Sequence, residues 1–128
     1  MDEQKKSTIL VVEDDAPSAL ALGDKLTQEG FNVVKAENGE EGLKQALSTH
    51  PDLILADLIM PKMGGMDMIR ELRKDAWGKT AKVIILTNVT DVETVEQAMK
   101  EEAFFYMVKG DSTPAEIVAK VRARLSGM

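Results

Sequence analysis

Carboxylates in this sequence stand directly after two apolar runs, where they could bind a cation or accept a phosphoryl group. Glu13, Asp14 and Asp15 follow the run ILVV, and Asp57 follows the run LILA. Burying an ionised carboxylate without a partner costs several kcal/mol. Asp57 therefore needs a compensating cation or a place at the end of its run, where water enters.

Two further groups follow later apolar runs, the hydroxyl of Thr87 and the ammonium of Lys109. Like charges a few ångströms apart repel by about 4 kcal/mol per pair at an effective dielectric constant near 20, so a carboxylate cluster needs a cation. Magnesium suits an all-oxygen site that lacks histidine and cysteine. A carboxylate beside Mg2+, a lysine and a hydroxyl can accept a phosphoryl group, with Asp57 as nucleophile, Lys109 as clamp and Thr87 as hydrogen-bond donor.

The elements that would bring these groups together alternate along the chain. Runs of aliphatic and β-branched residues predict five strands, at 9–12, 32–36, 53–56, 83–86 and 104–108. Nearly continuous apolar character is typical of strands covered on both faces of a parallel sheet. We therefore expect an α/β three-layer sandwich: a five-stranded parallel sheet in the flavodoxin-like order 2-1-3-4-5, with five helices. Ligands bind beyond the carboxyl ends of such strands, so the polar groups should gather at one edge.

Start and stop residues delimit the five helices. The start signals are a proline in a first turn, an N-cap residue and two capping boxes, at Pro17, Asn38, Thr90–Glu93 and Thr113–Glu116. The third helix follows Gly64-Gly65, whereas Gly30 and His50-Pro51 end the first and the second. Aliphatic spacing of three and four predicts buried faces that include Leu26 in the first helix and Leu47 in the second.

Length and composition limit the class of protein. A chain of 128 residues, 44% of them apolar, has room for one sizeable core, so we expect a single domain over 1–128 with its core at about 7–125. The absence of cysteine excludes disulfides and thiolate metal sites, and the polar start MDEQKKST predicts a cytoplasmic protein. The lack of a long apolar run and the net charge of -6 argue against membrane and direct nucleic-acid partners.

Segments in matching order and spacing resemble the receiver domains of two-component response regulators. ILVVEDD resembles the first strand with its acidic pair, LILADLIMPKMGG the phosphoacceptor segment, and IILTN and FYMVKG the last two strands. The resemblance extends from about Ser7 to Leu125. The roles that it implies are Mg2+ ligands at Glu13, Asp14 and Asp57, a phosphoacceptor at Asp57, switch residues at Thr87 and Tyr106, and the family's active-site lysine at Lys109.

The resemblance also implies a mechanism. The phosphohistidine of a sensor histidine kinase or phosphotransfer protein, or a small phosphodonor, phosphorylates Asp57. Thr87 is then drawn in, Tyr106 turns inward, and the surface of the fourth helix, fifth strand and fifth helix changes its affinity for an output protein. Such a protein is a phosphoacceptor that assists its own phosphorylation and dephosphorylation rather than an enzyme. A stand-alone receiver is expected; a fragment of a longer regulator and a phosphorylation-dependent homodimer stay open.

Three positions depart from the family's usual pattern. Gly110 stands in place of a proline, so we expect a trans Lys109–Gly110 peptide and a looser loop, since a cis bond there costs roughly 2.5 to 4 kcal/mol. Asn88 stands in place of a small residue and would crowd the phosphoryl site or donate a hydrogen bond to it. Gly64 replaces a polar residue before Gly65, which adjusts the start of the third helix.

Ile59 and Val89 occupy the two positions that line the path of hydrolytic water in the family. Neither side chain can hydrogen-bond to a water molecule. We therefore predict slow loss of the phosphoryl group.

Simpler interpretations compete at other positions. Asp15, just before Ala16-Pro17, fits a helix cap better than a metal ligand. Tyr106 is equally compatible with a partly exposed strand residue. His50, the only histidine, is expected at an exposed helix end without a phosphotransfer role, and the methionines between 60 and 68 are expected to fill core and loop.

Other function classes fit the sequence less well. The acidic EDDAPS loop would repel a flavin phosphate, and the GxGxxG pattern of dinucleotide-binding domains is absent there. Phosphohydrolases with an aspartate nucleophile have a second aspartate two residues later, which acts as the general acid. Ile59 stands at that position here and cannot transfer a proton. The alternative to an active receiver is a pseudo-receiver, an interaction module that phosphorylation does not regulate. Asn88 and Gly110 keep this alternative open, because both depart from the family's usual pattern.

Overall fold

A computed structural model describes residues 6–88, 93, 96–97, 100 and 105–127. Its sheet has five parallel strands in the order β2-β1-β3-β4-β5, as predicted. The strands are β1 (Thr8–Val12), β2 (Asn32–Ala36), β3 (Leu53–Ala56), β4 (Val83–Thr87) and β5 (Phe105–Val108). Each agrees with its predicted run to within a residue, except that Phe104 lies outside the described residues.

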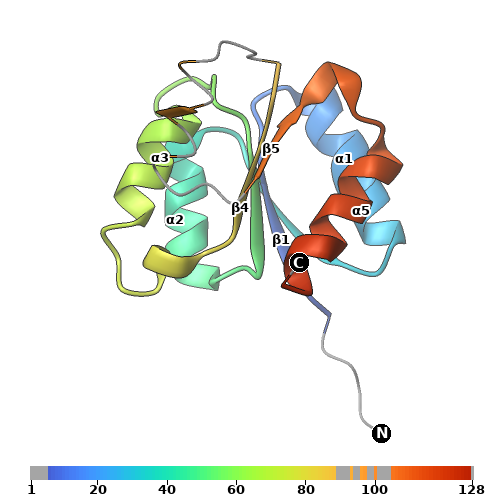
Figure 1. Ribbon diagram of the computed structural model, residues 1–128, viewed down its shortest axis with the longest axis horizontal. Helices are drawn as coiled ribbons and strands as arrows, with labels where there is room; N and C mark the ends of the chain where they lie inside the picture. The colour runs from blue at the N-terminus through green and yellow to red at the C-terminus, as the bar shows by residue number, and fades with distance from the viewer. Residues whose placement is uncertain (1–5, 89–92, 94–95, 98–99, 101–104, 128) are drawn as a thin grey trace, which may run out of the picture.

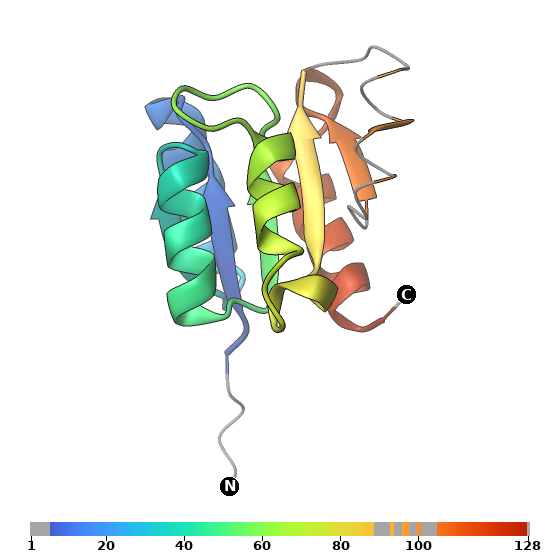
Figure 2. The ribbon, with the colours of Figure 1, turned by 90° about the vertical axis from the view of Figure 1, so that its left-hand side faces the viewer.

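Helices cover both faces of the sheet and make a three-layer sandwich (Figure 1). The α-helices of the described part are α1 (Ala16–Gln28), α2 (Gly39–Thr49), α3 (Gly65–Leu72) and α5 (Pro114–Leu125). Two short 3-10 helices, η1 (Gly78–Thr80) and η2 (Lys109–Asp111), precede β4 and follow β5. Helices α2 and α3 lie on one face, and α1 and α5 on the other (Figures 1 and 2). The predicted fourth helix, with Thr90 at its start, falls largely outside the described residues.

The core consists of two apolar clusters, one on each face of the sheet. Leu10 and Val12 point into the cluster under α2 and α3, whereas Ile9 and Val11 point into the cluster under α1 and α5. Both sets are fully buried, which explains why the central strands are apolar without alternation. Burying each such side chain stabilises the fold by about 1.5–3 kcal/mol.

The helix ends follow the predicted chemistry. Asp15 caps α1 by accepting the Ser18 N–H at 3.1 Å, and Asn38 caps α2. The capping box Thr113–Glu116 starts α5 with both of its hydrogen bonds formed. Gly30, with φ +99°, follows the end of α1, and His50 ends α2 in the left-handed conformation. The cap assignment of Asp15 is thus confirmed.

The prediction that Leu47 is buried is wrong, because the side chain is 37% exposed. The buried face of α2 instead contains Gly42 and Ala46. A Cβ on Gly42 would lie 2.8–2.9 Å from atoms of Met68 and Val12, so α2 packs here with its backbone close to the sheet. This rotation of the helix leaves Leu47 at the margin.

The carboxyl ends of β1, β3, β4 and β5 point toward the same end of the molecule (Figures 1 and 2). The loops that follow these strands carry the polar residues predicted to act together. In the described part of the chain, no helix has the length and apolar character needed to cross a membrane.

Candidate functional site

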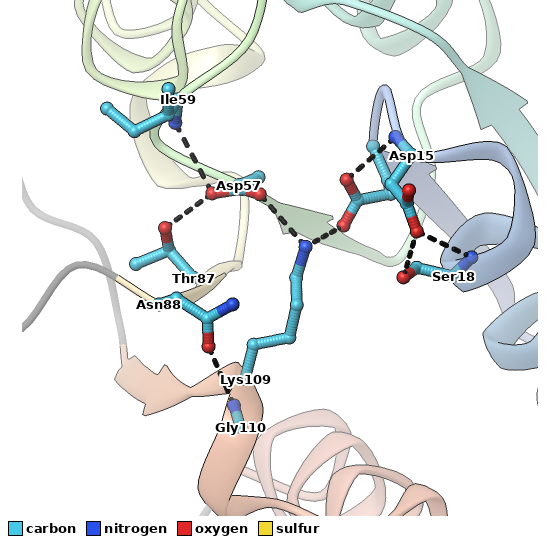
Figure 3. A network of polar contacts seen from close by, with 9 residues as sticks. Asp15, Ser18, Asp57, Ile59, Thr87, Asn88, Lys109 and Gly110 are labelled. Carbon is cyan, nitrogen blue, oxygen red and sulfur yellow. Dashed lines mark hydrogen bonds and ion pairs between the residues drawn. The ribbon is translucent and has the colours of Figure 1, made fainter.

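Asp57 directly follows β3 and is only 9% exposed. Its Oδ1 accepts hydrogen bonds from the hydroxyl of Thr87 and, at 3.3 Å, from the N–H of Ile59. Its Oδ2 accepts a hydrogen bond from the Lys109 ammonium at 3.0 Å (Figure 3). Both oxygens therefore have partners, and the buried charge of this carboxylate is compensated by a lysine.

Lys109 begins η2 and bridges two carboxylates that come from different strands. Its Nζ donates to Oε1 of Glu13, which directly follows β1, as well as to Oδ2 of Asp57. Burial alone lowers the pKa of the Lys109 amine, but its hydrogen bonds to Glu13 and Asp57 outweigh burial and hold the pKa above its ordinary value. The amine is therefore charged at neutral pH.

Three carboxylates converge on a position that fits a divalent cation. Glu13, Asp14 and Asp57 each offer one oxygen, and these three atoms lie within 4.8 Å of one another. With three negative charges and the one positive charge of Lys109, the group has a formal charge of -2. Hard oxygen ligands on a site of this charge suit Mg2+ better than a softer transition metal.

Asp15 has a different environment from these three carboxylates. Its Oδ2 accepts hydrogen bonds from the hydroxyl and N–H of Ser18, and these bonds lower its pKa. The N–H of Asp15 donates to Glu13 Oε2 at 3.0 Å and so helps to orient Glu13. Asp15 thus acts on the site through its backbone.

The loop after β3 folds back over the backbone of Asp57. The N–H of Gly65 donates to the carbonyl of Leu58 at 3.0 Å. A Cβ on Gly65 would lie 2.3 Å from the Asp57 carbonyl oxygen, and one on Gly64 would lie 2.7 Å from that of Leu58. Gly64 is the N-cap of α3 and has no side chain to cap it. The two glycines let the chain turn close to Asp57, which goes beyond the expected adjustment of the helix start.

Asn88 makes a contact that the sequence did not predict. Its Oδ1 accepts the N–H of Gly110 at 2.8 Å, so this side chain connects the loop after β4 with η2 (Figure 3). The Lys109–Gly110 peptide is trans, as expected. The loop expected to be looser is therefore held by a side-chain hydrogen bond.

Tyr106 lies in β5 with its ring packed against the core cluster under α2 and α3. Its hydroxyl is buried and has no hydrogen-bond partner in the described part of the chain. Burial, and secondarily the charge of Asp57, raise the pKa of Tyr106. The side chain is thus half-buried, with its polar end inside the protein.

A family model described as the response regulator receiver domain matches residues 9–122. The chain belongs to this family of receiver domains. The strand order 2-1-3-4-5 and the acidic site at the carboxyl ends of β1 and β3 agree with the resemblance that the sequence indicated.

Individual relatives are similar over nearly the whole receiver domain. The DNA-binding response regulator MtrA of Mycolicibacterium paratuberculosis is 38% identical over 120 residues, which cover 94% of this chain and 52% of MtrA. A putative response regulator from Chloroflexus aurantiacus has a TM-score of 0.88 and 30% identity, with 95% and 99% of the two chains covered. The CheX-CheY-BeF3-Mg+2 complex from Borrelia burgdorferi contains a chain with a TM-score of 0.84 and 25% identity, with 92% and 88% covered. The chain spans about half the length of the curated relatives it matches.

The receiver fold brings together most residues that the sequence singled out. Five of them meet around the carboxylate cluster: Glu13, Asp14, Asp57, Thr87 and Lys109. Ile59 lies beside Asp57 with its side chain 67% exposed, whereas Val89 lies outside the described residues. Exposed His50 stacks on Trp77, away from the Asp57 contacts, and Met60 and Met68 are buried in the core.

Proposed function

We propose that Asp57 accepts a phosphoryl group from the phosphohistidine of a sensor histidine kinase or a phosphotransfer protein. The supporting observation is that a hydroxyl and an ammonium contact the two oxygens of Asp57 beside two further carboxylates. In the transfer, an Asp57 oxygen bonds to phosphorus, the bond from phosphorus to the imidazole nitrogen breaks, and the imidazole leaves with that electron pair. The product is an acyl phosphate on Asp57.

The surrounding residues have separate roles in this step. Lys109 offsets negative charge on the phosphoryl oxygens, and Thr87 donates its hydroxyl hydrogen bond to one of them. Glu13, Asp14 and Asp57 would hold Mg2+, which supplies further charge neutralisation when bound. The CheX-CheY-BeF3-Mg+2 complex from Borrelia burgdorferi, which contains a chain similar to this one, supports this assignment.

Intact-mass spectrometry after incubation with acetyl phosphate and Mg2+ tests the proposal. We expect the mass of one phosphoryl group on the wild type, and none on Asp57→Asn or with excess chelator. The matched control is Asp52→Asn, an exposed aspartate before β3, which should be phosphorylated like the wild type. Failure with acetyl phosphate and with a panel of phosphorylated histidine kinases would favour the alternative, a pseudo-receiver that acts without phosphorylation.

We further propose that phosphorylation changes a surface made by the fourth helix, β5 and α5, and that this surface binds an output protein. Tyr106 supports the role of β5, because this strand carries a buried hydroxyl near the Asp57 site that lacks a partner in the described part. A homodimer formed on phosphorylation is one form of this output. Light scattering with and without beryllium fluoride and Mg2+ would detect it as a doubling of mass.

The receiver is proposed to be one domain over residues 1–128 that acts through proteins. Relatives such as MtrA are named DNA-binding response regulators, but this chain matches only about half of their length. Their DNA binding is therefore not assigned to this chain. The net charge of -6 supports protein partners over direct contact with nucleic-acid phosphates.

Slow dephosphorylation is a prediction for the Ile59 position. The side chain is exposed beside Asp57 and cannot orient water, so Ile59→Asn should shorten the phosphoryl lifetime about threefold or more. The decay of the phosphorylated mass after removal of the donor measures this lifetime. Leu47→Asn, which changes another exposed aliphatic residue, is the control. An unchanged lifetime in Ile59→Asn would count against the proposed role.

A further inference from the structure

Asn88 and Gly110 meet at the edge of the Asp57 site. The backbone pairing between β4 and β5 reaches Thr87 and Val108. One residue beyond Thr87, the Oδ1 of Asn88 accepts the N–H of Gly110 at 2.8 Å. The connection between the two strands thus continues past their last ladder pair through a side chain.

These contacts close a ring that begins and ends at Asp57 (Figure 3). Oδ1 of Asp57 accepts the Thr87 hydroxyl, and Thr87 is bonded covalently to Asn88. Asn88 binds Gly110, which is bonded covalently to Lys109, and the Lys109 ammonium returns to Oδ2 of Asp57 at 3.0 Å. Of the noncovalent links in this ring, the Asn88–Gly110 hydrogen bond is the one that does not involve the carboxylate.

We infer that Asn88 is a positioning residue, which holds Lys109 in register with Thr87 by binding the N–H of Gly110. The inference rests on the proposed function, because the two groups held in register are those that contact the phosphoacceptor. The Lys109 ammonium reaches Asp57 from η2 and the Thr87 hydroxyl from the end of β4, so a contact between these two elements is needed to hold the groups in register.

The chemistry of this turn explains why such a link is needed. Lys109 reaches Asp57 through a long flexible stem, and glycine at the next position leaves the backbone unusually free. Apart from the contacts of the Lys109 ammonium, the other hydrogen bonds described in this turn are local: Ser112 Oγ donates to the Val108 carbonyl at 2.8 Å, and Ser112 N–H donates to Lys109 O at 3.4 Å. The Asn88 bond ties the turn to β4, the strand that carries Thr87.

The two residue types are complementary. Asparagine offers an amide oxygen as acceptor, and glycine offers a backbone N–H, which proline lacks. A Cβ on Gly110 would lie 3.3 Å from Asn88 Oδ1, so alanine keeps the donor at the cost of a small displacement. The link therefore depends on the N–H at position 110 more than on the absence of a side chain.

The experiment is a double-mutant cycle of phosphorylation rates with saturating acetyl phosphate and Mg2+. Asn88→Ala should react about three- to tenfold more slowly than the wild type, the range expected for loss of one hydrogen bond. Gly110→Pro should be slowed similarly, whereas Gly110→Ala should retain more of the rate than Gly110→Pro. The double variant Asn88→Ala with Gly110→Pro should be no slower than the slower single variant. Asn32→Ala changes an exposed asparagine at the start of β2 and is the control.

Two readouts separate positioning from a structural role. The Gly110 amide proton resonance should move upfield in Asn88→Ala, as expected when its hydrogen bond is lost. The thermal midpoint should change by less than about 2 °C, because Asn88 and Gly110 are both exposed and water can replace the bond.

The outcomes separate the two levels of proposal. A phosphorylated wild type with an equally fast Asn88→Ala, or additive losses in the double variant, would overturn the positioning role and leave the proposed function intact. A wild type that gains no phosphoryl group on Asp57 would overturn both.

Discussion

Lys109 separates two carboxylates, Glu13 and Asp57, that would otherwise lie close together without a compensating cation. The lysine and a bound Mg2+ would compete for the same two carboxylates, because Glu13 and Asp57 both pair with Lys109 and both belong to the acidic cluster that could hold a metal. The charge of Lys109 therefore affects both the stability of the metal-free protein and its affinity for the ion.

Lys109→Met should destabilise the metal-free protein by about 1–3 kcal/mol, since it removes the ammonium that donates to one oxygen of each of two buried carboxylates. The same change should increase the affinity for Mg2+ several-fold, because the ion no longer shares Glu13 with an ammonium. Urea unfolding without metal and calorimetric titration with Mg2+ measure the two effects. Lys44→Met, which removes an exposed charge from α2, should change neither. Weaker Mg2+ binding in Lys109→Met would contradict this prediction.

Tyr106 is the only tyrosine, so absorbance near 295 nm reports its ionisation alone. Burial and the charge of Asp57 should place its pKa above the ordinary value of 10.0, with Tyr106→Phe as the silent control. The unfolded chain would release this proton at lower pH, so the stability contribution is complete below about pH 10 and is lost as pH rises further. The raised pKa of Lys109 acts in the same direction above about pH 10.5. A tyrosine titration at or below pH 10 in the folded protein would show that the hydroxyl is not buried.

At the scale of elements, the loop between β3 and α3 sets where Asp57 lies. Gly65 allows the loop to pass the Asp57 carbonyl at a distance that a side chain would not permit. Gly23 in α1 differs, because a Cβ there would meet the movable end of the Lys35 side chain. The two glycines therefore provide a matched comparison.

Gly65→Ala should lower the free energy of unfolding by about 1–3 kcal/mol and slow phosphorylation of Asp57, because backbone atoms must shift. Gly23→Ala should be neutral or stabilising, since alanine favours the helix interior by roughly 0.5–1 kcal/mol and Lys35 can move aside. Urea denaturation and the acetyl phosphate reaction provide the measurements. Equal stability of the two variants would contradict the close approach at Gly65.

The sequence predicted the described elements well because their signals are local. Apolar runs gave the strands of the sheet, and Asp15, Asn38 and Thr113 cap helices where their types predict. The predicted burial of Leu47 failed because the rotation of α2 depends on the fit of Gly42 against another helix and the sheet. Periodicity alone does not contain that contact.

The sequence predicted which residues gather at the candidate site, but not which of them contact one another. Polar residues at strand ends must meet at one edge of a parallel sheet, which brought Asp14, Asp57 and Lys109 together. Glu13 and Lys109 are 96 positions apart, and the sequence does not specify which carboxylate the lysine selects. The hydrogen bond from the Gly110 N–H to Asn88 Oδ1 was not predictable, because it joins residues 22 positions apart and depends on the side-chain rotamer of Asn88 and the course of η2.

At the scale of the whole molecule, the Asp57 site and the fluorescent side chain of Trp77 lie at opposite ends of the sheet. Trp77, the only tryptophan, precedes η1 and stacks on His50 with ring centroids 4.3 Å apart and 9° between the planes. These residues precede the amino ends of β4 and β3, whereas Asp57 follows the carboxyl end of β3. The stack thus reports on the far end of the domain.

Mg2+ and phosphorylation should leave Trp77 emission nearly unchanged, whereas His50→Ala should alter it by removing the stacked ring. Fluorescence titration with Mg2+, with calorimetry to verify that the ion binds, measures this. A saturable change in Trp77 emission that follows Mg2+ occupancy would show that the site is coupled to the far end of the sheet.

The identity of the phosphoacceptor is tested most directly by reduction of the phosphorylated protein with borohydride and peptide mapping by mass spectrometry. An acyl phosphate on aspartate is reduced to homoserine, so the modification marks the acceptor position. We expect homoserine at position 57 in the sample treated with acetyl phosphate and Mg2+, and none in the sample treated with chelator. Homoserine at Asp14 or another aspartate, or a phosphoryl group that resists reduction, would contradict the assignment of Asp57.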